Sequence, residues 1–398
     1  MVSRPEFDFA AGLALSPAND EAVRCVVMRG GTSRGLFFHE QDLPSHPAQR
    51  DRVIMGAIGA PDPRQVDGLG GADMLLSKVA IVAKSTDADA DVDCEFANIT
   101  PGKERPTYGT NCGNLVAAVA LFAMEEGLVS ADRGAPIIRI RNRNSGSLIE
   151  ADISALDAKG RKSFQLAGMP DTGACVDLDF LEPVGTTQSL LLPTGNVRES
   201  IVLENGISAD ISIVDAGALY VFVKAKDLGL TASETGDELQ NAPGAFDCLE
   251  RLRAEAAKML GLVESAADAA LVTPDVPKLA IVGPAVSYRC DASAIEVSSE
   301  SIDLVSRIVS SQKYHKAYAV TGAIATAAAA AIAGSTVYEA VGGNEGTGWQ
   351  EVRIGHPSGV MCCEVESRLS AGDYDIARAR IRRTARRVSQ GTVFVPNP

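Results

Sequence analysis

A cysteine stands directly before one of the most apolar segments of the chain. Cys112 is followed by Gly113 and Asn114 and then by residues 115–126, whose composition predicts a helix buried on nearly every face. Backbone N–H groups at the start of a helix can bind an anion, and the helix dipole stabilises a thiolate there. Such a thiol can act as a nucleophile or exchange protons near neutral pH. The alternative, about as common, is a buried cysteine without a chemical role.

A lysine follows a glycine-rich loop and opens an apolar run. Lys78 comes shortly after the loop of residues 67–73, which fails as a dinucleotide-binding fingerprint because Asp73 replaces the third glycine of G-x-G-x-x-G. A lysine in a pocket can lose its proton and act as a base, or keep its charge and pair with a substrate carboxylate. The commoner alternative is a lysine whose ammonium group reaches solvent.

Residues 29–35 read Arg-Gly-Gly-Thr-Ser-Arg-Gly and predict a turn between two strands. Its backbone N–H groups can converge into an anion-binding nest, and the hydroxyl groups of Thr32 and Ser33 add donors. Carboxylate binding is the natural use, with Arg29 and Arg34 compensating charge. An ordinary glycine hairpin is an equal alternative.

The second half of the chain offers a matching segment. Residues 315–322 lead into a second apolar helix, predicted over residues 324–332, with Thr321 where a thiol could have stood and Gly322 beside it. A lone histidine in a turn, such as His356, is more often structural than catalytic. The further donors expected in this half lie in the turn of residues 355–359, at Ser358 and Gly359.

Six arginines crowd the C-terminal region. Such clusters can hold phosphates, but no aromatic residues for base stacking lie between them, and the chain as a whole is acidic. We therefore expect a solvated strand or helix face that pairs with Asp and Glu side chains. The six are Arg378, Arg380, Arg382, Arg383, Arg386 and Arg387.

Composition narrows the class of protein. The 398 residues are 46% hydrophobic, enough for a large core in two domains or a duplicated unit. A formal charge of −14 argues against nucleic acid and anionic membranes as partners, because both would repel the chain. No apolar run reaches the length of a membrane span, and no basic targeting segment opens the sequence. Eight cysteines without a Cys-x-x-Cys pair favour reduced thiols over disulfides or zinc, so we expect a cytoplasmic protein without a metal.

Short strand-like runs outnumber helical patterns and do not alternate with them regularly, which favours an α+β fold. Each half contains one apolar helix that a curved sheet could enclose. A Pro-Thr-Gly-Asn turn at residues 193–196 suggests one domain of residues 1–192 and another of residues 193–398. The predicted strands are 23–28, 137–140, 211–214, 220–223 and 279–282, and the predicted helices are 115–126, 246–260, 302–312 and 324–332.

On these residues the sequence resembles the PrpF family, which includes 2-methylaconitate isomerase, methylitaconate isomerase and 4-oxalomesaconate tautomerase. The resemblance extends over about residues 24–396. Family members usually have Lys where Arg34 stands, a substitution that keeps the charge but changes its geometry. The similar segments are 28–35, 62–73, 77–80, 111–114, 192–196, 315–317, 355–359 and 383–387.

The resemblance implies a diaminopimelate-epimerase-like fold. Two similar domains would each wrap a curved, barrel-like sheet around a central helix, with the active site in the cleft between them. In the epimerases each central helix presents a cysteine, whereas here only the first does, at Cys112. The resemblance carries over Lys78 and Cys112 as the proton-transfer residues and implies no cofactor.

We therefore expect a cofactor-free isomerase. It would move a proton, by double-bond migration or cis-trans isomerisation, in a small unsaturated tricarboxylate such as 4-oxalomesaconate, 2-methylaconitate or aconitate. A base and an acid are needed, and either Lys78 or Cys112 could be the base. Backbone N–H groups at two facing helix ends would hold the carboxylates and the developing charge. The expected substrate-binding residues are Arg29, Thr32, Ser33, Arg34, Asn111, Gly113, Asn114, Thr321, Gly322, Ser358 and Gly359.

Three other classes of protein stay open. An amino-acid racemase or epimerase predicts a second thiol before the second helix. A cysteine hydrolase needs a histidine oriented on Cys112, for which His315 or His356 could serve. A non-catalytic carboxylate-binding protein would not depend on Lys78 for turnover. The sequence does not define an oligomeric state, and a homo-oligomer stays open.

Overall fold

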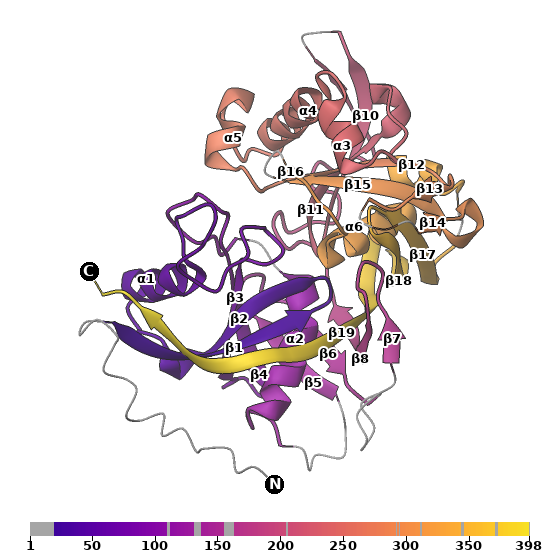
Figure 1. The fold of residues 1–398 in the computed structure, drawn as a ribbon. Helices are drawn as coiled ribbons and strands as arrows, with labels where there is room; N and C mark the ends of the chain where they lie inside the picture. Colours follow the sequence, from indigo (N-terminus) through magenta and orange to yellow (C-terminus); the bar gives the residue numbers. More distant parts are fainter. Residues whose placement is uncertain are drawn as a thin grey trace.

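One continuous curved sheet wraps two buried helices, one in each half of the chain (Figure 1). Among the residues described by the computed structural model, seventeen strands join into this sheet and two short strands form a separate pair. No helix in that part of the chain is long and apolar enough to cross a membrane. The described residues are 20–109, 112–130, 137–154, 163–203, 206–291, 293, 295–310, 313–343, 346–370 and 373–397.

In the N-terminal half, α2 (Gly113–Glu125) lies inside the curve of the sheet and α1 (Pro47–Ile58) covers the outer face. Side chains of a strand alternate between faces, so Ala80 of β3 (Lys78–Lys84) joins the core around α2 while Val79 packs with α1. The other strands of this half are β1 (Glu21–Gly30), β2 (Ser33–His39), β4 (Val92–Asn98), β5 (Ile137–Asn142), β6 (Leu148–Asp152), β7 (Ser163–Gln165) and β8 (Thr172–Leu181).

The C-terminal half repeats this packing. The helix α6 (Val320–Ala330) lies inside and α4 (Ala245–Met259) outside, with Ala280 of β12 (Lys278–Pro284) in the inner core and Leu279 in the outer one. The remaining elements are β9 (Glu199–Val202), β10 (Ser208–Ala216), β11 (Ala218–Lys224), α3 (Gly236–Asn241), α5 (Ala269–Val272), β13 (Tyr288–Arg289), β14 (Glu296–Val297), β15 (Leu304–Ser310), β16 (Lys313–Tyr314), α7 (Thr336–Ala340), β17 (Gly348–His356), β18 (Gly359–Ser370) and β19 (Asp373–Val395).

The two halves share one pattern of strand pairing. In the first half, β1 and β2 form a hairpin, β2 runs parallel to β3, β3 antiparallel to β4, β4 parallel to β5, and β5 antiparallel to β6, which pairs with β8. The same series recurs in the pairs β10–β11, β11–β12, β12–β15, β15–β17, β17–β18 and β18–β19. The halves are therefore structural repeats, and a position in one has a counterpart in the other.

The last strand connects the repeats. β19, 23 residues long and yellow in Figure 1, pairs with β18 over residues 373–380, with β8 over residues 378–385 and with β1 over residues 385–395. Its hydrogen bonds therefore tie the end of the chain to strands of both halves. The domain boundary at residue 192 stays a prediction.

The two apolar helices are buried as predicted. Every residue of α6 is buried, and so are residues 113–120 of α2. Gly217, between β10 and β11, allows the sheet to approach α6 closely, because a Cβ atom there would lie 3.2 Å from Ile324. Burial on all sides is the state that a helix without a polar face requires. Each helix is thus fixed from all directions, and its N-terminus is held in a defined place.

One predicted helix is wrong, because residues 302–312 contain β15 instead. Apolar residues recur there at a spacing that also fits a helix, but Val and Ile favour strands. β15 lies between β12 and β17, and residues 304–309 are all buried, so a two-residue alternation of polarity is missing. The other three predicted helices and the five predicted strands are confirmed by α2, α4, α6, β1, β5, β10, β11 and β12.

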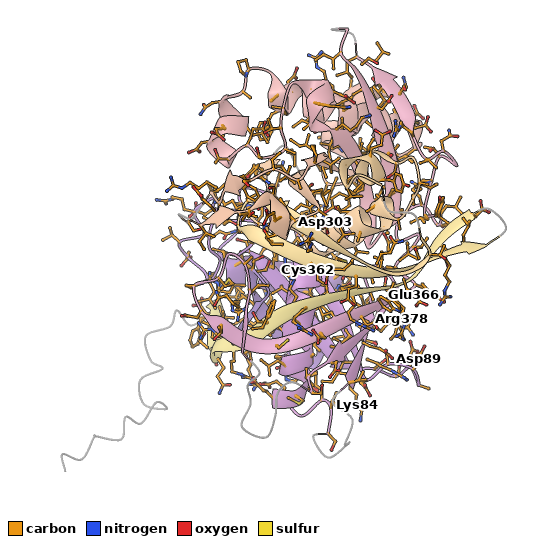
Figure 2. All side chains as sticks on the ribbon, turned by 90° about the vertical axis from the view of Figure 1, so that its right-hand side faces the viewer. Lys84, Asp89, Asp303, Cys362, Glu366 and Arg378 are labelled. Carbon is orange, nitrogen blue, oxygen red and sulfur yellow. The ribbon has the colours of Figure 1, made fainter. Side chains whose placement is uncertain are left out.

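The arginines of β19 mostly form the ion-paired face that was predicted. Arg378 and Arg380 both donate to Asp179 of β8 at 3.1 Å. Figure 2 shows Arg378 close to Glu366, its cross-strand partner in β18. Arg383 departs from this pattern because its side chain is buried, and burial lowers its pKa to about 10.

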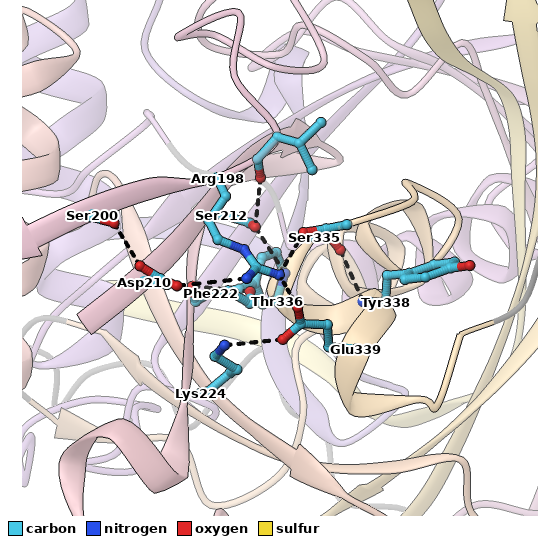
Figure 3. Close-up of polar contacts among 12 residues, drawn as sticks. Arg198, Ser200, Asp210, Ser212, Phe222, Lys224, Ser335, Thr336, Tyr338 and Glu339 are labelled. Carbon is cyan, nitrogen blue, oxygen red and sulfur yellow. Dashed lines mark hydrogen bonds and ion pairs between the residues drawn. The ribbon is translucent and has the colours of Figure 1, made fainter.

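A polar network anchors the segment that follows α6 (Figure 3). Glu339 of α7 accepts hydrogen bonds from Arg198 and, at 3.0 Å, from Lys224 Nζ. The backbone N–H of Thr336 donates to Ser212 Oγ at 3.0 Å. These contacts fix α7 to β10 and β11, and so they hold the C-terminal end of α6 in its own half.

Candidate active site

The N-termini of the two buried helices face each other. A Cβ atom on Gly113, the first residue of α2, would lie 2.6 Å from Cγ1 of Val320, the first residue of α6. Only glycine permits this approach without a shift of the neighbouring helix. Within the described residues, no side chain caps either helix, so the first backbone N–H groups remain for a ligand.

A cavity lies at this junction. It contains about 780 Å³ of empty space, part of it open to solvent, and both halves line it. The lining residues of the N-terminal half are Ser33, Met74, Leu75, Lys78, Asn98, Ile99, Thr100, Thr107, Cys112, Gly113 and Asn114, and those of the C-terminal half are Tyr220, Asp275, Lys278, Ile308, His315, Ala319, Val320 and Thr321.

Lys78 and Cys112 line this cavity together. Lys78 is the first residue of β3, and its Nζ donates to Oδ1 of Asn98 on β4 at 2.8 Å. Cys112 is the residue directly before α2 and is 6% exposed. A strand start and a helix start therefore bring together an amine and a thiol that are 34 positions apart in the sequence.

In the N-terminal half of the cavity, two buried polar groups lack partners. Within the described chain, Ser33 Oγ and Asn114 Oδ1 have no hydrogen bond, although their residues are only 2% and 4% exposed. Asn114 is held by the glycine turn, since a Cβ atom on Gly31 (φ 53°) would lie 2.1 Å from its Oδ1. Buried polar atoms are nearly always paired, so these two indicate the place of a polar ligand.

Arg29, the first arginine of the turn, makes hydrogen bonds that stabilise the turn itself. Arg29 Nη1 donates to Gly31 O at 2.9 Å and to Thr384 Oγ1 at 2.8 Å, and burial, together with nearby Arg386, lowers its pKa. The Gly31 N–H also donates to Thr384 O, at 2.8 Å. Arg29 does not line the cavity, and the Gly31 N–H is already engaged, so this turn offers fewer free donors than a nest would.

Two other residues of the turn also lie outside the cavity lining. Arg34 Nη2 donates to Gly70 O at 3.4 Å, and its backbone N–H donates to Leu75 O at 2.9 Å. The arginine therefore steadies the loop that precedes Lys78. Thr32 Oγ1 is buried and has no hydrogen-bond partner among the described residues. Of the predicted donors of this turn, Ser33 alone lines the cavity.

The residues predicted as donors at positions 358 and 359 do not line the cavity. Ser358 Oγ donates to Lys316 O at 2.6 Å, and Gly359 O accepts from the Tyr288 hydroxyl at 2.6 Å. The Ser358 contact braces the segment that leads to α6, and the Gly359 contact joins β18 to β13. Asn111 lies outside the described residues, so its predicted role stays a prediction.

The first residues of α2 and α6 change one correspondence between the two halves that the sequence had suggested. Cys112 precedes the first residue of α2, and the residue that precedes α6 is Ala319. Thr321 is therefore the counterpart of Asn114, not of the thiol, although it does line the cavity. Gly322 is covered by Tyr220, whose hydroxyl oxygen would lie 2.9 Å from a Cβ atom at that position.

Lys278 is a cavity residue that sequence reasoning missed. A signal was present: residues 78–82 read Lys-Val-Ala-Ile-Val and residues 278–282 read Lys-Leu-Ala-Ile-Val. Each segment opens the strand that runs parallel to the second strand of its half. The internal repeat would have revealed the second lysine if the two halves had been aligned.

His315 contributes a neutral ring to the cavity. Its Nδ1 accepts from the Ala317 N–H at 3.3 Å. Burial lowers the pKa of His315 to about 4, and the charges of Lys278 and Lys78 act in the same direction. With Nδ1 used as an acceptor, the proton of the neutral ring is on Nε2, which makes that atom a donor.

A wider cleft leads to the cavity and shares Met74, Leu75 and His315 with it. Across this cleft Lys316 Nζ lies 2.8 Å from Asp73 Oδ2, an ion pair between the two halves. Burial by itself would raise the pKa of Asp73, but the hydrogen bonds from Lys316 and the Leu75 N–H lower it. Within the described residues, no group of three or more His, Cys, Asp or Glu side chains is arranged to hold a metal.

Comparison with known proteins identifies relatives along nearly the whole chain. The family model described as "PrpF protein" matches residues 21–396. The chain is 38% identical to 3-methylitaconate isomerase of Eubacterium barkeri (94% of this chain and 97% of that one). It is 35% identical to 2-methyl-aconitate isomerase of Shewanella oneidensis (94% and 97%). It is 32% identical to 4-oxalomesaconate tautomerase of Pseudomonas putida (94% and 96%).

Solved structures agree with this result. The crystal structure of methylitaconate-delta-isomerase matches with a TM-score of 0.77 and 36% identity, over 95% of this chain and 97% of that one. A hydroxyproline epimerase from Agrobacterium vitis matches with a TM-score of 0.52 and 14% identity, over 95% and 94%, which indicates the fold alone.

The repeated fold, with a cavity between its helix ends, is the diaminopimelate-epimerase-like architecture that the sequence predicted. The relatives named above identify the chain as an isomerase. The chain belongs to the PrpF family.

Proposed function

We propose that this isomerase moves a proton along a small unsaturated tricarboxylate, with Lys78 and Cys112 as proton-transfer residues. The supporting observation is that both residues line one cavity with Ser33 and Asn114, whose buried polar atoms lack partners among the described residues. The relatives named above are isomerases of methylitaconate and 2-methylaconitate and a tautomerase of 4-oxalomesaconate. All three substrates are unsaturated carboxylic acids with an allylic C–H bond.

The reaction needs three things from the protein. A base takes a proton from the allylic carbon, the resulting dienolate is stabilised, and an acid returns a proton at another carbon of the conjugated system. The Lys78 amine and the Cys112 thiol can perform the two transfers. The N–H groups at the starts of α2 and α6 can hold the carboxylates and the charge that develops on them.

The local charge of the cavity suits a polyanion. The chain carries a formal charge of −14, which by itself repels a tricarboxylate. Lys78 and the positive ends of two helix dipoles offset this repulsion inside the cavity.

Incubation in D₂O tests the proposal. The protein is supplied with cis- and trans-aconitate, 2-methylaconitate, methylitaconate and 4-oxalomesaconate, and ultraviolet absorbance and deuterium uptake are followed. We expect at least one acid to give an isomer of unchanged composition, with deuterium or internal proton transfer at the allylic carbon. We expect Lys78→Ala to slow kcat by about 10²–10⁴-fold, the usual contribution of a general acid or base.

The same assay separates the alternatives. Unaltered turnover by Lys78→Ala would remove this lysine from the mechanism, and absence of any turnover by the wild type would favour a carboxylate-binding protein. A hydrolysis product would indicate a cysteine hydrolase, although His315 already uses Nδ1 for the Ala317 N–H. A racemase with two thiols is disfavoured, because Ala319 occupies the second thiol position.

A further inference from the structure

Two lysines occupy matching places in the two repeats. Lys78 opens β3 and pairs in register with Gly35 of the parallel strand β2, while Lys278 opens β12 and pairs with Tyr220 of the parallel strand β11. Each is followed by an apolar stretch that joins the core, and each lines the cavity between the helix ends. The two amines therefore reach one cavity from different halves of the molecule.

The surroundings of the two amines differ. Lys78 Nζ donates to the side-chain oxygen of Asn98 at 2.8 Å. Lys278 Nζ lies 5.9 Å from the centroid of the Tyr220 ring. Burial lowers the pKa of Lys278, although the negative charges of Asp275 and of a Cys112 thiolate oppose the shift. The neutral amine therefore forms more readily at Lys278 than at an exposed lysine.

We propose that Lys278 is the catalytic base supplied by the C-terminal half, in the cavity that it shares with Lys78 and Cys112. This inference rests on the proposed function for the reaction, and it replaces one of the two proton-transfer groups named there. The neutral amine forms an N–H bond as the allylic C–H bond breaks, and the released electron pair moves into the conjugated carbons and their carboxylate. Lys78 or Cys112 then forms the new C–H bond and gives up one proton. The two protein groups regain their starting protonation through the solvent-open cleft, and nothing is oxidised or reduced.

The other groups that face Lys278 limit what its pH dependence can report. They are Asp275 from its own segment, Tyr220 from β11, Cys112 and Lys78 from the other half, and His315 from the segment before α6. Burial raises the pKa of Tyr220, and it lowers that of His315 to about 4. Neither the phenol nor the imidazole therefore changes charge near neutral pH. A limb of the pH profile that disappears on removal of Lys278 can be assigned without them.

Two substitutions of Lys278 distinguish a role in proton transfer from a role of the positive charge alone. Lys278→Met removes the amine, and Lys278→Arg keeps the charge but supplies a group that does not lose its proton. We expect both to slow kcat by about 10²–10⁴-fold, with a smaller change in KM. The matched control is Lys226→Met, which alters an exposed lysine of the same half and should leave kcat and KM unchanged.

Recovery of kcat to within a few-fold in Lys278→Arg would overturn the proposal, because charge alone would then suffice. An active wild type together with an equally active Lys278→Met variant would also overturn it while leaving the proposed function intact. A wild type inactive on every acid would instead reject the proposed function.

A second measurement does not depend on turnover or on the folding of a variant. The wild-type protein is acetylated with limiting acetic anhydride at pH 7.5, with and without tricarballylate, a saturated tricarboxylate, and each lysine is quantified by mass spectrometry. We expect tricarballylate to slow acetylation of Lys278 several-fold and to leave Lys226 unchanged. Equal acetylation of Lys278 under both conditions would place this amine outside the substrate site and overturn the proposal.

Discussion

The two halves of the molecule use one backbone plan but exchange large and small side chains at matched positions. In the N-terminal half, Gly35 of β2 allows Leu115 of α2 to approach closely, with its Cδ1 2.9 Å from the place of a Cβ atom. In the C-terminal half the sizes are reversed, because Tyr220 occupies the position of Gly35 and Gly322 that of Leu115. The exchange carries a phenol to the cavity in one half and an aliphatic side chain into the core in the other.

The residues before the two helices differ in the same way. Cys112 precedes α2, whereas Ala319 precedes α6 and can neither accept nor donate a proton. The C-terminal half instead supplies Tyr220, Lys278 and His315 to the cavity. A repeated scaffold thus fixes where chemical groups can be placed, while each half carries its own set of groups.

Moving the thiol from the start of α2 to the start of α6 tests this comparison. Among the predictions made here, we expect it to have the largest effect on kcat. We expect Cys112→Ala to slow kcat by about 10²–10⁴-fold, because the N-terminal half would lose one of its two proton-transfer groups. Adding Ala319→Cys to that variant should not restore activity, since the new thiol would stand on the side of Lys278. The measurement is kcat on the acid that the wild type isomerises.

The control is Ala319→Cys alone, which should retain the fold by circular dichroism and thermal unfolding. Restoration of activity in the double variant would contradict the comparison, because the two helix starts would then be chemically equivalent.

The contact between the helix ends should respond to one added methyl group. Gly113→Ala would place a Cβ atom 2.6 Å from Val320 Cγ1, so α2 or α6 must shift. We expect the free energy of unfolding to fall by about 1–3 kcal/mol, as in other overpacked cores, and KM to rise as the cavity widens. Urea unfolding and steady-state kinetics measure the two effects.

The matched control for this variant is Gly391→Ala. Nothing lies within 4 Å of the Cβ position at Gly391, and its φ is not in the left-handed region. That change should alter the free energy of unfolding by no more than about 0.5 kcal/mol. An equal effect of both substitutions would mean that the facing helix ends are not tightly packed.

The sequence predicted the parts of the fold that one segment determines by itself. The helices around residues 115–126 and 324–332 were recognised because they lack a polar face, which leaves burial as the only stable arrangement. The strand of residues 304–310 was mistaken for a helix because both of its faces are buried in the finished sheet. Its polarity therefore carries no two-residue alternation that a single segment could show.

The same distinction applies to the candidate site: residues marked by a local pattern were predicted, and residues placed by tertiary packing were missed. Cys112 was found from its own helix and Lys78 from the glycine-rich loop before it, both of them local signals. Lys278 follows an ordinary segment, and its place appears only when the halves are compared. Tyr220 reaches the cavity because Gly322, about a hundred positions later, leaves room for its ring. Such distant pairs of large and small residues are set by tertiary packing, which no single motif contains.

The ion pair across the outer cleft should give the smallest effect. Asp73 is held by Lys316 and by the Leu75 N–H, which lower the pKa of its carboxyl group. Because the folded-state pKa lies below the unfolded value of about 3.9, the stabilisation is present above that pH and disappears as pH falls through the folded-state pKa. The Lys316 side chain is 74% exposed, so solvent screening limits the contribution to about 1 kcal/mol or less.

We therefore expect Asp73→Asn to lower the free energy of unfolding by at most about 1 kcal/mol at pH 7, and the difference from wild type to shrink progressively as pH falls below the unfolded-state value of about 3.9. Chemical unfolding at a series of pH values measures this, with Asp237→Asn, an exposed carboxylate of the same cleft, as the control. A difference that did not shrink as pH fell would mean that Asp73 acts through backbone geometry in the loop before Lys78. In that case opening of the cleft would not depend on this ion pair.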